Sequence, residues 1–247
     1  MESRSTQQGF TLVELAVVLI CISIVSASVL KAQEMVRQAR IKTTIAQVQS
    51  YQAAYKTFQD TYQFLPGDIP AAQAILPNCT AANSCFNGNG NKVIGSADTA
   101  AIRKGIQVIS DEETQFWKHL VAAELITGVD LTTADIAWGK SHPVSPLTVG
   151  GFSVATSNTP DWQSSPSGFV MRIHPRLNIE NIEMAQPAPT SPYEAGQIDR
   201  TIDDGHPAKG GMRTTAFGDP ANDERLAGCE VEYTALPDKI CFVYFKL

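Results

Sequence analysis

The chain has 247 residues, of which 43% are hydrophobic and 18% are charged, and its formal net charge is −6. This length and composition suit a folded domain with one sizeable core. The negative total excludes the generally basic surface that nucleic-acid binding calls for, although a local basic patch is compatible with it.

The first predicted element is a membrane-length helix over residues 10–30, which contain no Gly or Pro and no charged residue except Glu14. At 1.5 Å per residue the segment spans roughly 31 Å, enough for one bilayer crossing. A carboxylate inside such a segment costs roughly 2.5–3.5 kcal/mol on insertion scales, so we expect a partner that neutralises it. Cleavage after Gly9 would supply one, because the new amine of Phe10 lies four residues before Glu14.

Other interpretations of this segment stay open on the residues alone. The stretch Ser26-Ala27-Ser28 would also suit a signal peptidase, and an uncleaved anchor could hold Glu14 at the membrane interface. A secreted or signal-anchored enzyme is the function that accompanies these alternatives. The helical pattern argues against signal-peptidase cleavage because it continues past Ser28 without a break.

Residues 31–62 are amphipathic, with polar side chains between apolar residues at helical spacing. The apolar positions are Ile41, Ile45, Val48, Tyr55, Phe58 and Tyr62. Together with residues 10–30 they predict one helix of about fifty residues, roughly 80 Å long, which is far above the globular average.

The remaining segment, from residue 63 onward, predicts a head with short helices and strands. Residues 65–68 end the long helix, and we expect Asp68 to cap a short helix that runs through Leu76. The Asn-Gly alternation in residues 86–91 favours turns over a calcium loop, because no carboxylate in that segment supplies charge.

Two further helices are predicted in the head from capping boxes. Ser110 and Glu113 indicate a helix over residues 111–126, and Ser191 and Glu194 start a shorter one that ends near Gly205. The predicted strands are Phe152–Ala155, Phe169–His174, Glu230–Tyr233 and Ile240–Phe245. A long helix followed by short strands predicts an α+β fold with an antiparallel sheet.

The cysteines indicate an oxidising environment for the head. Cys21 lies in the apolar segment, where we interpret it as a small hydrophobic residue. The other four cysteines form two close pairs in the sequence, Cys79 with Cys85 and Cys229 with Cys241. Four cysteines allow three connectivities, of which spacing favours the local one. Zinc is the rival interpretation, but neither pair has CxxC spacing or a histidine nearby in the sequence.

Calcium is the one candidate cofactor, and catalysis finds little support. Asp203, Asp204 and Asp219 are the first candidate ligands, because several carboxylates near a glycine turn suit calcium. The alternative is that Asp203-Asp204-Gly205 is an ordinary helix exit. The four histidines are scattered, and no GxSxG, HExxH or phosphate-binding glycine loop occurs, so we predict that the protein is not an enzyme.

The junction at residues 9–14, GFTLVE, resembles the processing site of type IV pilins and type II secretion pseudopilins. The resemblance implies that prepilin peptidase cuts between Gly9 and Phe10 and methylates the amine of Phe10. It also implies that Glu14 attracts the amine of a neighbouring subunit during filament assembly. An intrachain pair between Phe10 and Glu14 is a competing geometry, since the two are one helical turn apart. Residues 62–68 are similar to a recurring end of this helix in pilin-like proteins.

The resemblance implies a ladle-shaped α+β fold with four regions. These are the leader at residues 1–9, the transmembrane or filament-core helix at 10–30, its amphipathic continuation at 31–62 and the globular head at 63–247. It further implies that a Cys229–Cys241 disulfide closes the last part of the sheet, and it supports calcium because the major pseudopilin has such a site. Two features depart from the family: the long helix lacks a proline, and the leader contains a single base, Arg4.

The implied function is that of a structural subunit of a type IV pilus or a secretion pseudopilus. An alternative is a minor or tip pilin whose enlarged head binds a surface, DNA or a secreted cargo. The implied partners are identical or related pilin subunits, prepilin peptidase, the inner-membrane assembly platform and, before assembly, membrane lipid. The bases that follow residue 30 would by themselves place the carboxyl end in the cytoplasm. The cleavage motif and the cysteines outweigh them, so we expect a single-pass inner-membrane protein with its head outside the cytoplasm, and then a periplasmic or extracellular filament.

Overall fold

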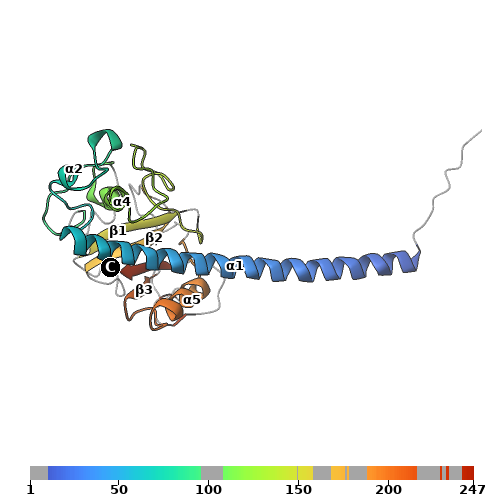
Figure 1. The fold of residues 1–247 in the computed structure, drawn as a ribbon. Helices are drawn as coiled ribbons and strands as arrows, with labels where there is room; N and C mark the ends of the chain where they lie inside the picture. The colour runs from blue at the N-terminus through green and yellow to red at the C-terminus, as the bar shows by residue number, and fades with distance from the viewer. Residues whose placement is uncertain are drawn as a thin grey trace, which may run out of the picture. The chain divides into compact units, whose positions relative to one another are not determined.

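The computed structural model describes residues 11–95, 108–148, 150–157, 168–175, 177, 188–215, 229, 232–233 and 241–247. The chain divides into two units, Met1–Arg40 and Ile41–Leu247, the second of which we call the head unit (Figure 1).

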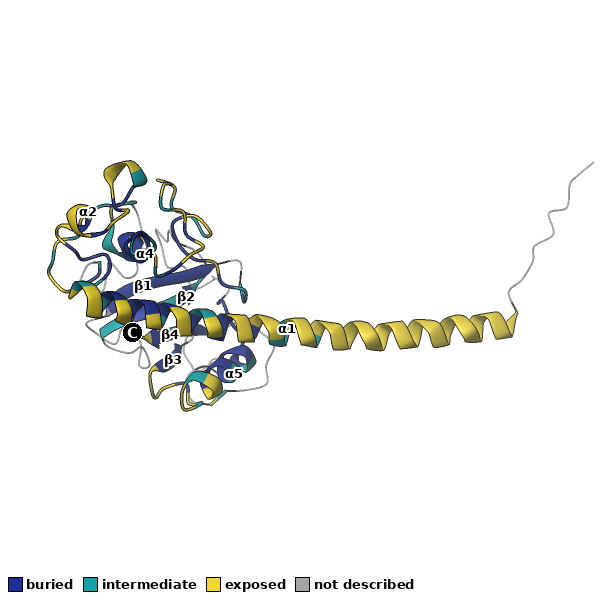
Figure 2. Ribbon diagram, in the orientation of Figure 1, coloured by how far each residue is buried: buried dark blue, intermediate teal, exposed yellow. Residues whose placement is uncertain are grey.

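The predicted long helix is confirmed as α1, Leu12–Tyr62, with 51 residues. Its two parts have different surroundings. Residues 11–33 are exposed throughout, whereas a stripe at helical spacing is buried from Ile41 onward (Figure 2). The buried positions are Ile41, Thr44, Ile45, Val48, Tyr51, Ala54, Tyr55 and Phe58. The second part of α1 is therefore a core element of the head unit.

A four-stranded antiparallel sheet forms the other layer of the head unit. Its strands are β1 Gly151–Ser157, β2 Gly168–His174, β3 Met212–Thr215 and β4 Phe242–Lys246, in the order β1-β2-β4-β3. With α1 this gives the predicted α+β, pilin-like layout.

The strand predictions were right for three strands of this sheet and wrong in two respects. Phe152–Ala155 and Phe169–His174 lie within β1 and β2, and Ile240–Phe245 overlaps β4. The predicted strand Glu230–Tyr233 lies half outside the described residues, and its described half, residues 232–233, is not extended into a strand. Strand β3 was missed, because four residues that include Arg213 carry too little periodicity to be recognised.

Aromatic side chains join α1 to the sheet and to helix α4, Glu112–Ala122. The ring of Tyr51 lies edge-on to Trp117 of α4 and to Phe152 of β1, with centroid separations of 5.2 Å and 5.3 Å. Such edge-to-face pairs contribute about 0.5–1.5 kcal/mol beyond their burial. Helix α4 lies beside β1, and α5, Pro192–Ile202, lies beside β3 (Figure 1).

One predicted capping box is confirmed and the other is wrong. Ser191 caps α5, since its hydroxyl accepts the Glu194 N–H at 3.3 Å and the Glu194 carboxylate accepts the Ser191 N–H at 3.0 Å. Helix α4 instead has Asp111 at its N-cap, with no side-chain cap, so Ser110 does not pair with Glu113. The helix ends before Ile126 because Glu124 leaves the helical region with a φ of +60°.

Asp68 does not cap the short helix that follows it, which corrects another prediction. That helix, α2 Ala72–Ile75, is a single turn with Ala71 at its N-cap. The Asp68 carboxylate accepts three consecutive main-chain N–H groups, from Gly90 at 2.7 Å, Asn91 at 3.0 Å and Lys92 at 2.7 Å. The Asn-Gly segment is thus anchored by a carboxylate that comes from outside it.

Candidate functional site

The start of α1 places Glu14 in a reciprocal pair with Thr11. Oε2 of Glu14 accepts the main-chain N–H of Thr11 at 2.9 Å and its hydroxyl at 2.8 Å. The Thr11 Oγ1 in turn lies 3.3 Å from the N–H of Glu14, which donates to it. This is the S/T-x-x-E capping box, and it fixes the first turn of the helix. The T-x-x-E pattern at Thr11 and Glu14 is a local signal that is visible in the sequence.

The cap gives the Glu14 carboxylate neutral hydrogen-bond donors but no positive charge. One of its two oxygens, Oε2, receives both bonds from Thr11. A carboxylate offers about four acceptor positions, so it can also accept bonds from a cation. Gly9 and Phe10 lie outside the described residues, and their cleavage, methylation and pairing with Glu14 stay predictions.

The surface of α1 that follows Glu14 is apolar and exposed. Helix α1 is long and apolar enough to cross a membrane by its length and composition, and it lies near the amino terminus. The hydroxyls of Ser23 and Ser28 donate to the carbonyls of Leu19 and Ile24, at 2.7 Å and 2.9 Å. These serines therefore satisfy their hydrogen bonds within the helix, which is what a segment surrounded by hydrocarbon requires.

Two disulfides stabilise the head unit. They join Cys79 to Cys85 and Cys229 to Cys241, with Cα separations of 5.1 Å and 5.4 Å. Cys21 is a free, exposed cysteine on α1. All four bonded cysteines are buried. The local connectivity is the one that the sequence spacing favours.

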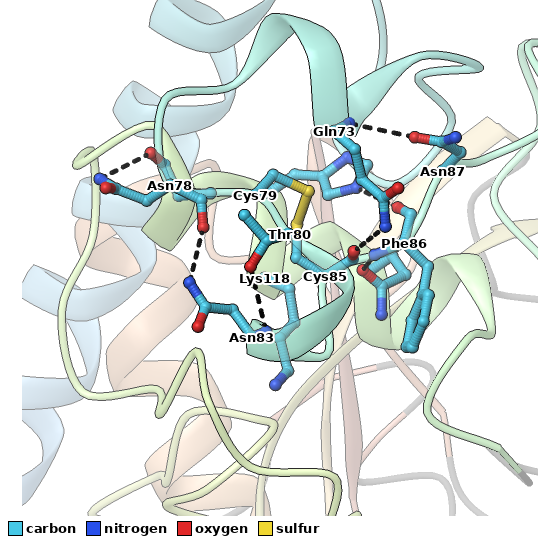
Figure 3. Close-up of a disulfide and its surroundings, with 12 residues drawn as sticks. Gln73, Asn78, Cys79, Thr80, Asn83, Cys85, Phe86, Asn87 and Lys118 are labelled. Carbon is cyan, nitrogen blue, oxygen red and sulfur yellow. Dashed lines mark hydrogen bonds between the residues drawn. A yellow bond between two sulfur atoms is a disulfide. The ribbon is translucent and has the colours of Figure 1, made fainter.

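Side chains hold the backbone on both sides of the Cys79–Cys85 disulfide (Figure 3). Gln73 donates to the Cys85 carbonyl at 2.8 Å, and Asn83 donates to the Asn78 carbonyl at 3.1 Å. The loop therefore has hydrogen bonds that fix its path in addition to the covalent link.

The second disulfide lies beside the sheet, because Cys241 directly precedes β4. Cys241 exchanges two main-chain hydrogen bonds with Thr190, whose hydroxyl also donates to the Cys241 carbonyl at 2.8 Å. The Thr214 hydroxyl of β3 donates to the carbonyl of Cys229. The bridge thus lies where α5, β3 and β4 meet.

His119 lies beside the first disulfide, a proximity in space that sequence distance concealed. One ring nitrogen of His119 and the sulfurs of Cys79 and Cys85 lie within 4.8 Å of one another. Both ring nitrogens are occupied, because Nδ1 accepts the Gly67 N–H at 2.9 Å and Nε2 lies 2.8 Å from the Phe86 carbonyl, to which it donates. Burial lowers the pKa of His119 to about 4, so the ring is neutral. The bonded sulfurs and occupied nitrogens do not fit a zinc site.

Lys118 is a buried cation that sequence reasoning missed. Its ammonium donates to the carbonyls of Asp130 at 3.2 Å, Leu131 at 2.8 Å and Thr133 at 2.6 Å. Burial lowers the pKa of Lys118 to about 8. No signal in the sequence separated it from an exposed lysine, since its acceptors belong to a loop a dozen or more residues away.

The candidate calcium ligands Asp203 and Asp204 lie together, whereas Asp219 is outside the described residues. Asp199 of α5 joins them, with ligand-type oxygens of all three within 4.8 Å of one another. The Asp203 carboxylate accepts the main-chain N–H groups of Gly211 and Met212, and Asp204 accepts that of His206 at 2.8 Å. These bonds give the two residues a loop-anchoring role.

Asp199 is the one member of this cluster that is fully buried. Its Oδ2 accepts the Tyr233 hydroxyl at 3.0 Å, and its Oδ1 has no hydrogen-bond partner. Burial raises the pKa of Asp199 to about 6. Calcium takes six to eight oxygen ligands, and Asp199 with the remaining acceptor positions of Asp203 and Asp204 could supply some of them, so a calcium site that includes Asp219 stays a prediction.

Comparison with known proteins identifies the amino-terminal part of the chain. Residues 4–30 match the family model of the prokaryotic N-terminal methylation motif, a family of structural proteins. No curated protein and no solved structure matches the chain. The matched segment contains the predicted cleavage site, Glu14 with its Thr11 cap, and the exposed apolar part of α1. The chain therefore carries the signature of the type IV pilin and pseudopilin prepilin-like proteins, joined to a head with a pilin-like α+β layout.

Proposed function

We propose that this protein is a structural filament subunit. Prepilin peptidase cleaves it between Gly9 and Phe10, the amine of Phe10 is methylated, and the subunit polymerises through the exposed part of α1. The product is a type IV pilus or a type II secretion pseudopilus. The observation that carries the proposal is an exposed apolar helix that contains the methylation motif and a single early acid, Glu14.

The exposed part of α1 needs an apolar environment. Leu12, Leu19 and Leu30 are 86%, 65% and 68% exposed, and the other large exposed apolar side chains along residues 13–36 are 49% to 71% exposed. Full burial of one such side chain stabilises by about 1.5–3 kcal/mol. Burial of several therefore outweighs the roughly 2.5–3.5 kcal/mol that one acid costs in a membrane. Both lipid and a bundle of neighbouring helices supply this burial.

Glu14 distinguishes the filament from the lipid. In lipid the Glu14 carboxylate has the neutral donors of Thr11 and, as a competing geometry, the amine of its own Phe10, whereas a filament also offers the cationic amine of a neighbouring subunit's Phe10. An amine and a carboxylate in apolar surroundings each cost several kcal/mol alone and much less together. The pair therefore favours release from lipid into the filament and sets the register between neighbours.

The proposed route begins in the inner membrane. Lipid surrounds residues 10–30 before assembly, the head lies outside the cytoplasm, and an inner-membrane assembly platform extracts the subunit. Two disulfides in the head unit support this orientation, because disulfides persist in oxidising compartments.

The test is the substitution Glu14→Ala in the native host, with Glu34→Ala as a control on the same helix. Glu34 accepts a hydrogen bond from Gln38 at 2.8 Å and lies beyond the matched motif. We expect Glu14→Ala to be cleaved and folded normally but to be missing from sheared fibres, while Glu34→Ala assembles. A normal fibre yield from Glu14→Ala contradicts the proposal. A separate variant, Gly9→Leu, should accumulate as an unprocessed band.

A minor or tip subunit is the second candidate. The observation that favours it is the insertion between α1 and β1, which contains α2, α4 and the Cys79–Cys85 disulfide. At the end of a filament such an insertion could contact another surface, DNA or a secreted cargo. Abundance separates the two roles, since a major subunit forms the bulk of sheared fibres and a tip subunit is nearly absent from them.

A further inference from the structure

The head unit contains an open cleft of about 430 Å³ that the proposed function does not yet use. One wall is α1, with Gln47, Ser50 and Tyr51. Residues 124–128, which follow α4, form the second wall, and Pro143 with Val144 forms the third. All of these residues belong to the head unit.

The polar side chains of the cleft are one carboxylate, one amide and three hydroxyls. Oε1 of Gln47 is buried and has no hydrogen-bond partner, while its amide nitrogen donates to the Val144 carbonyl at 3.4 Å. Glu124 adds a negative charge, and its Oε1 accepts a hydrogen bond from Asn78 at 3.1 Å. Among the described residues, the cleft lining includes no Lys, Arg or His. An unpaired buried acceptor beside a carboxylate calls for a donor that carries positive charge.

The apolar part of the cleft suits a long aliphatic chain. Val144 is 49% exposed, which is unusual for a large apolar side chain of this head, and the half-buried Leu125 is among the other lining residues. Glu124 has a φ of +60°, a conformation that glycine adopts far more readily. Backbone strain of this kind gathers at binding sites. An aliphatic stem with a cationic end is the side chain of lysine or arginine.

We infer that this cleft receives the side chain of Lys31 from a second copy of the chain. The inference rests on the proposed function, because it requires subunits to lie side by side. Lys31 is exposed and follows directly after the apolar segment. The structure records no partner for its ammonium among the described residues. Of the other bases nearby, Arg37 and Arg40 each have an interaction of their own, and Lys42 belongs to the head unit.

Assembly explains why Lys31 needs such a site. At the edge of a membrane its ammonium can reach the phosphates of lipid headgroups. A filament contains other subunits in place of that lipid, so the ammonium loses its counterions as neighbouring helices pack around it. Glu124 and Gln47 of another copy then supply one carboxylate and one amide oxygen. The same contact would stabilise the axial register of subunits independently of Glu14.

Zero-length coupling in assembled fibres tests the contact without any substitution. Fibres are grown from a mixture of ¹⁴N and ¹⁵N chains, treated with a carbodiimide and analysed by peptide mass spectrometry. We expect an amide between Glu124 and Lys31 whose two peptides carry different nitrogen isotopes in about half of the cases, as random mixing requires. Intact fibres in which Lys31 couples only to other carboxylates, or to none, overturn the inference. A Glu124–Lys31 amide of one isotope only overturns it as well, because that link is internal to a chain.

Matched variants give a second readout. Glu124→Gln should reduce fibre yield severalfold, whereas Asp135→Asn, which removes an exposed surface carboxylate paired with Lys140, should not. Each of the single variants Lys31→Glu and Glu124→Lys should lower the fibre yield. The double variant, which exchanges the two charges, should restore it. If Glu124→Gln gives the same fibre yield as the wild-type chain while Glu14→Ala gives no fibres, the inference is overturned and the proposed function stands. If the wild-type chain forms no fibres at all, both the inference and the proposed function are contradicted.

Discussion

Thr11 and Glu14 hydrogen-bond to each other at the start of α1, where the Glu14 carboxylate accepts two hydrogen bonds from Thr11 at 2.9 Å and 2.8 Å. The acid at the centre of the assembly proposal is thus also the N3 residue of a helix cap. Its carboxylate is held at the helix end before any neighbour arrives. Capping and pairing with an amine are compatible, because a carboxylate can accept several bonds at once.

Replacing Thr11 should loosen the first turn of α1. Thr11→Val removes the hydroxyl that bonds Glu14 in both directions, and loss of such a cap costs about 0.5–2 kcal/mol. In detergent micelles we expect the amides of residues 14 and 15 to exchange hydrogen several times faster in Thr11→Val. Thr11→Ser keeps the hydroxyl and serves as the control. Equal exchange in Thr11→Val and the wild-type chain would show that the cap does not hold the turn.

Replacing Lys118 should destabilise the head far more than replacing an exposed lysine. Lys118→Met leaves three carbonyls without their donor, and we expect it to cost about 2–4 kcal/mol of the free energy of unfolding. Lys140→Met removes only an exposed pair with Asp135, which contributes little to stability. Denaturant unfolding of the detergent-solubilised chain measures both. Similar losses in the two variants would contradict the structural role of Lys118.

The buried His119 should make the head less stable in acid. Its pKa is about 4 in the folded chain and near 6.5 when unfolded, so the unfolded chain binds the extra proton between these values. Stability from this group is therefore complete above about pH 6.5 and falls as the pH drops towards 4, by on the order of 3 kcal/mol. His142, whose pKa burial lowers to about 3, acts in the same direction. The raised pKa of Glu113, about 7, acts in the opposite direction.

The difference between the wild-type chain and His119→Gln isolates this effect. We expect the free-energy advantage of the wild-type chain to shrink between pH 6.5 and pH 4. The exposed His206 provides the control variant, His206→Gln. An advantage of His119 that is constant with pH would mean that the ring is not neutral and buried in the folded chain.

Asp203 should hold its loop without any metal. Asp203→Ala leaves the N–H groups of Gly211 and Met212 without their acceptor, at an expected cost of about 1–3 kcal/mol in the presence of a chelator. The calcium hypothesis adds that calcium raises the melting temperature of the wild-type chain but not that of Asp203→Ala. A loss of stability in Asp203→Ala, with no response of the wild-type chain to calcium, would support the loop-anchoring role of Asp203 and contradict the calcium hypothesis. No loss of stability would contradict the anchor.

The sequence predicted those elements whose signals are local. Helix α1 follows from periodicity and the absence of Gly and Pro, and α5 follows from the Ser191–Glu194 box. Helix α4 lies within the predicted residues 111–126, but the sequence did not indicate that most of its residues are buried, Lys118 and His119 included. The hydrogen-bond partners of Lys118 and His119 come from loops on several sides of the helix, and the periodicity of the sequence does not indicate such contacts.

Contacts between distant segments explain the remaining errors. Asp68 was assigned to a helix cap two or three residues away, yet its carboxylate binds main-chain groups 22 to 24 residues further along. Strand β3 exists because its four residues pair with β4 from a distant part of the chain. At the candidate site, Glu14 was identified from the cost of its charge, whereas its partner Thr11 was recognised only in the structure.

The most direct test of the account is the intact mass of the protein in filaments sheared from its native host. The account predicts a chain that begins at Phe10, carries one added methyl group, and lacks four hydrogens because of the two disulfides. A chain in that fraction that still begins at Met1, or one that begins after Ser28, would contradict it.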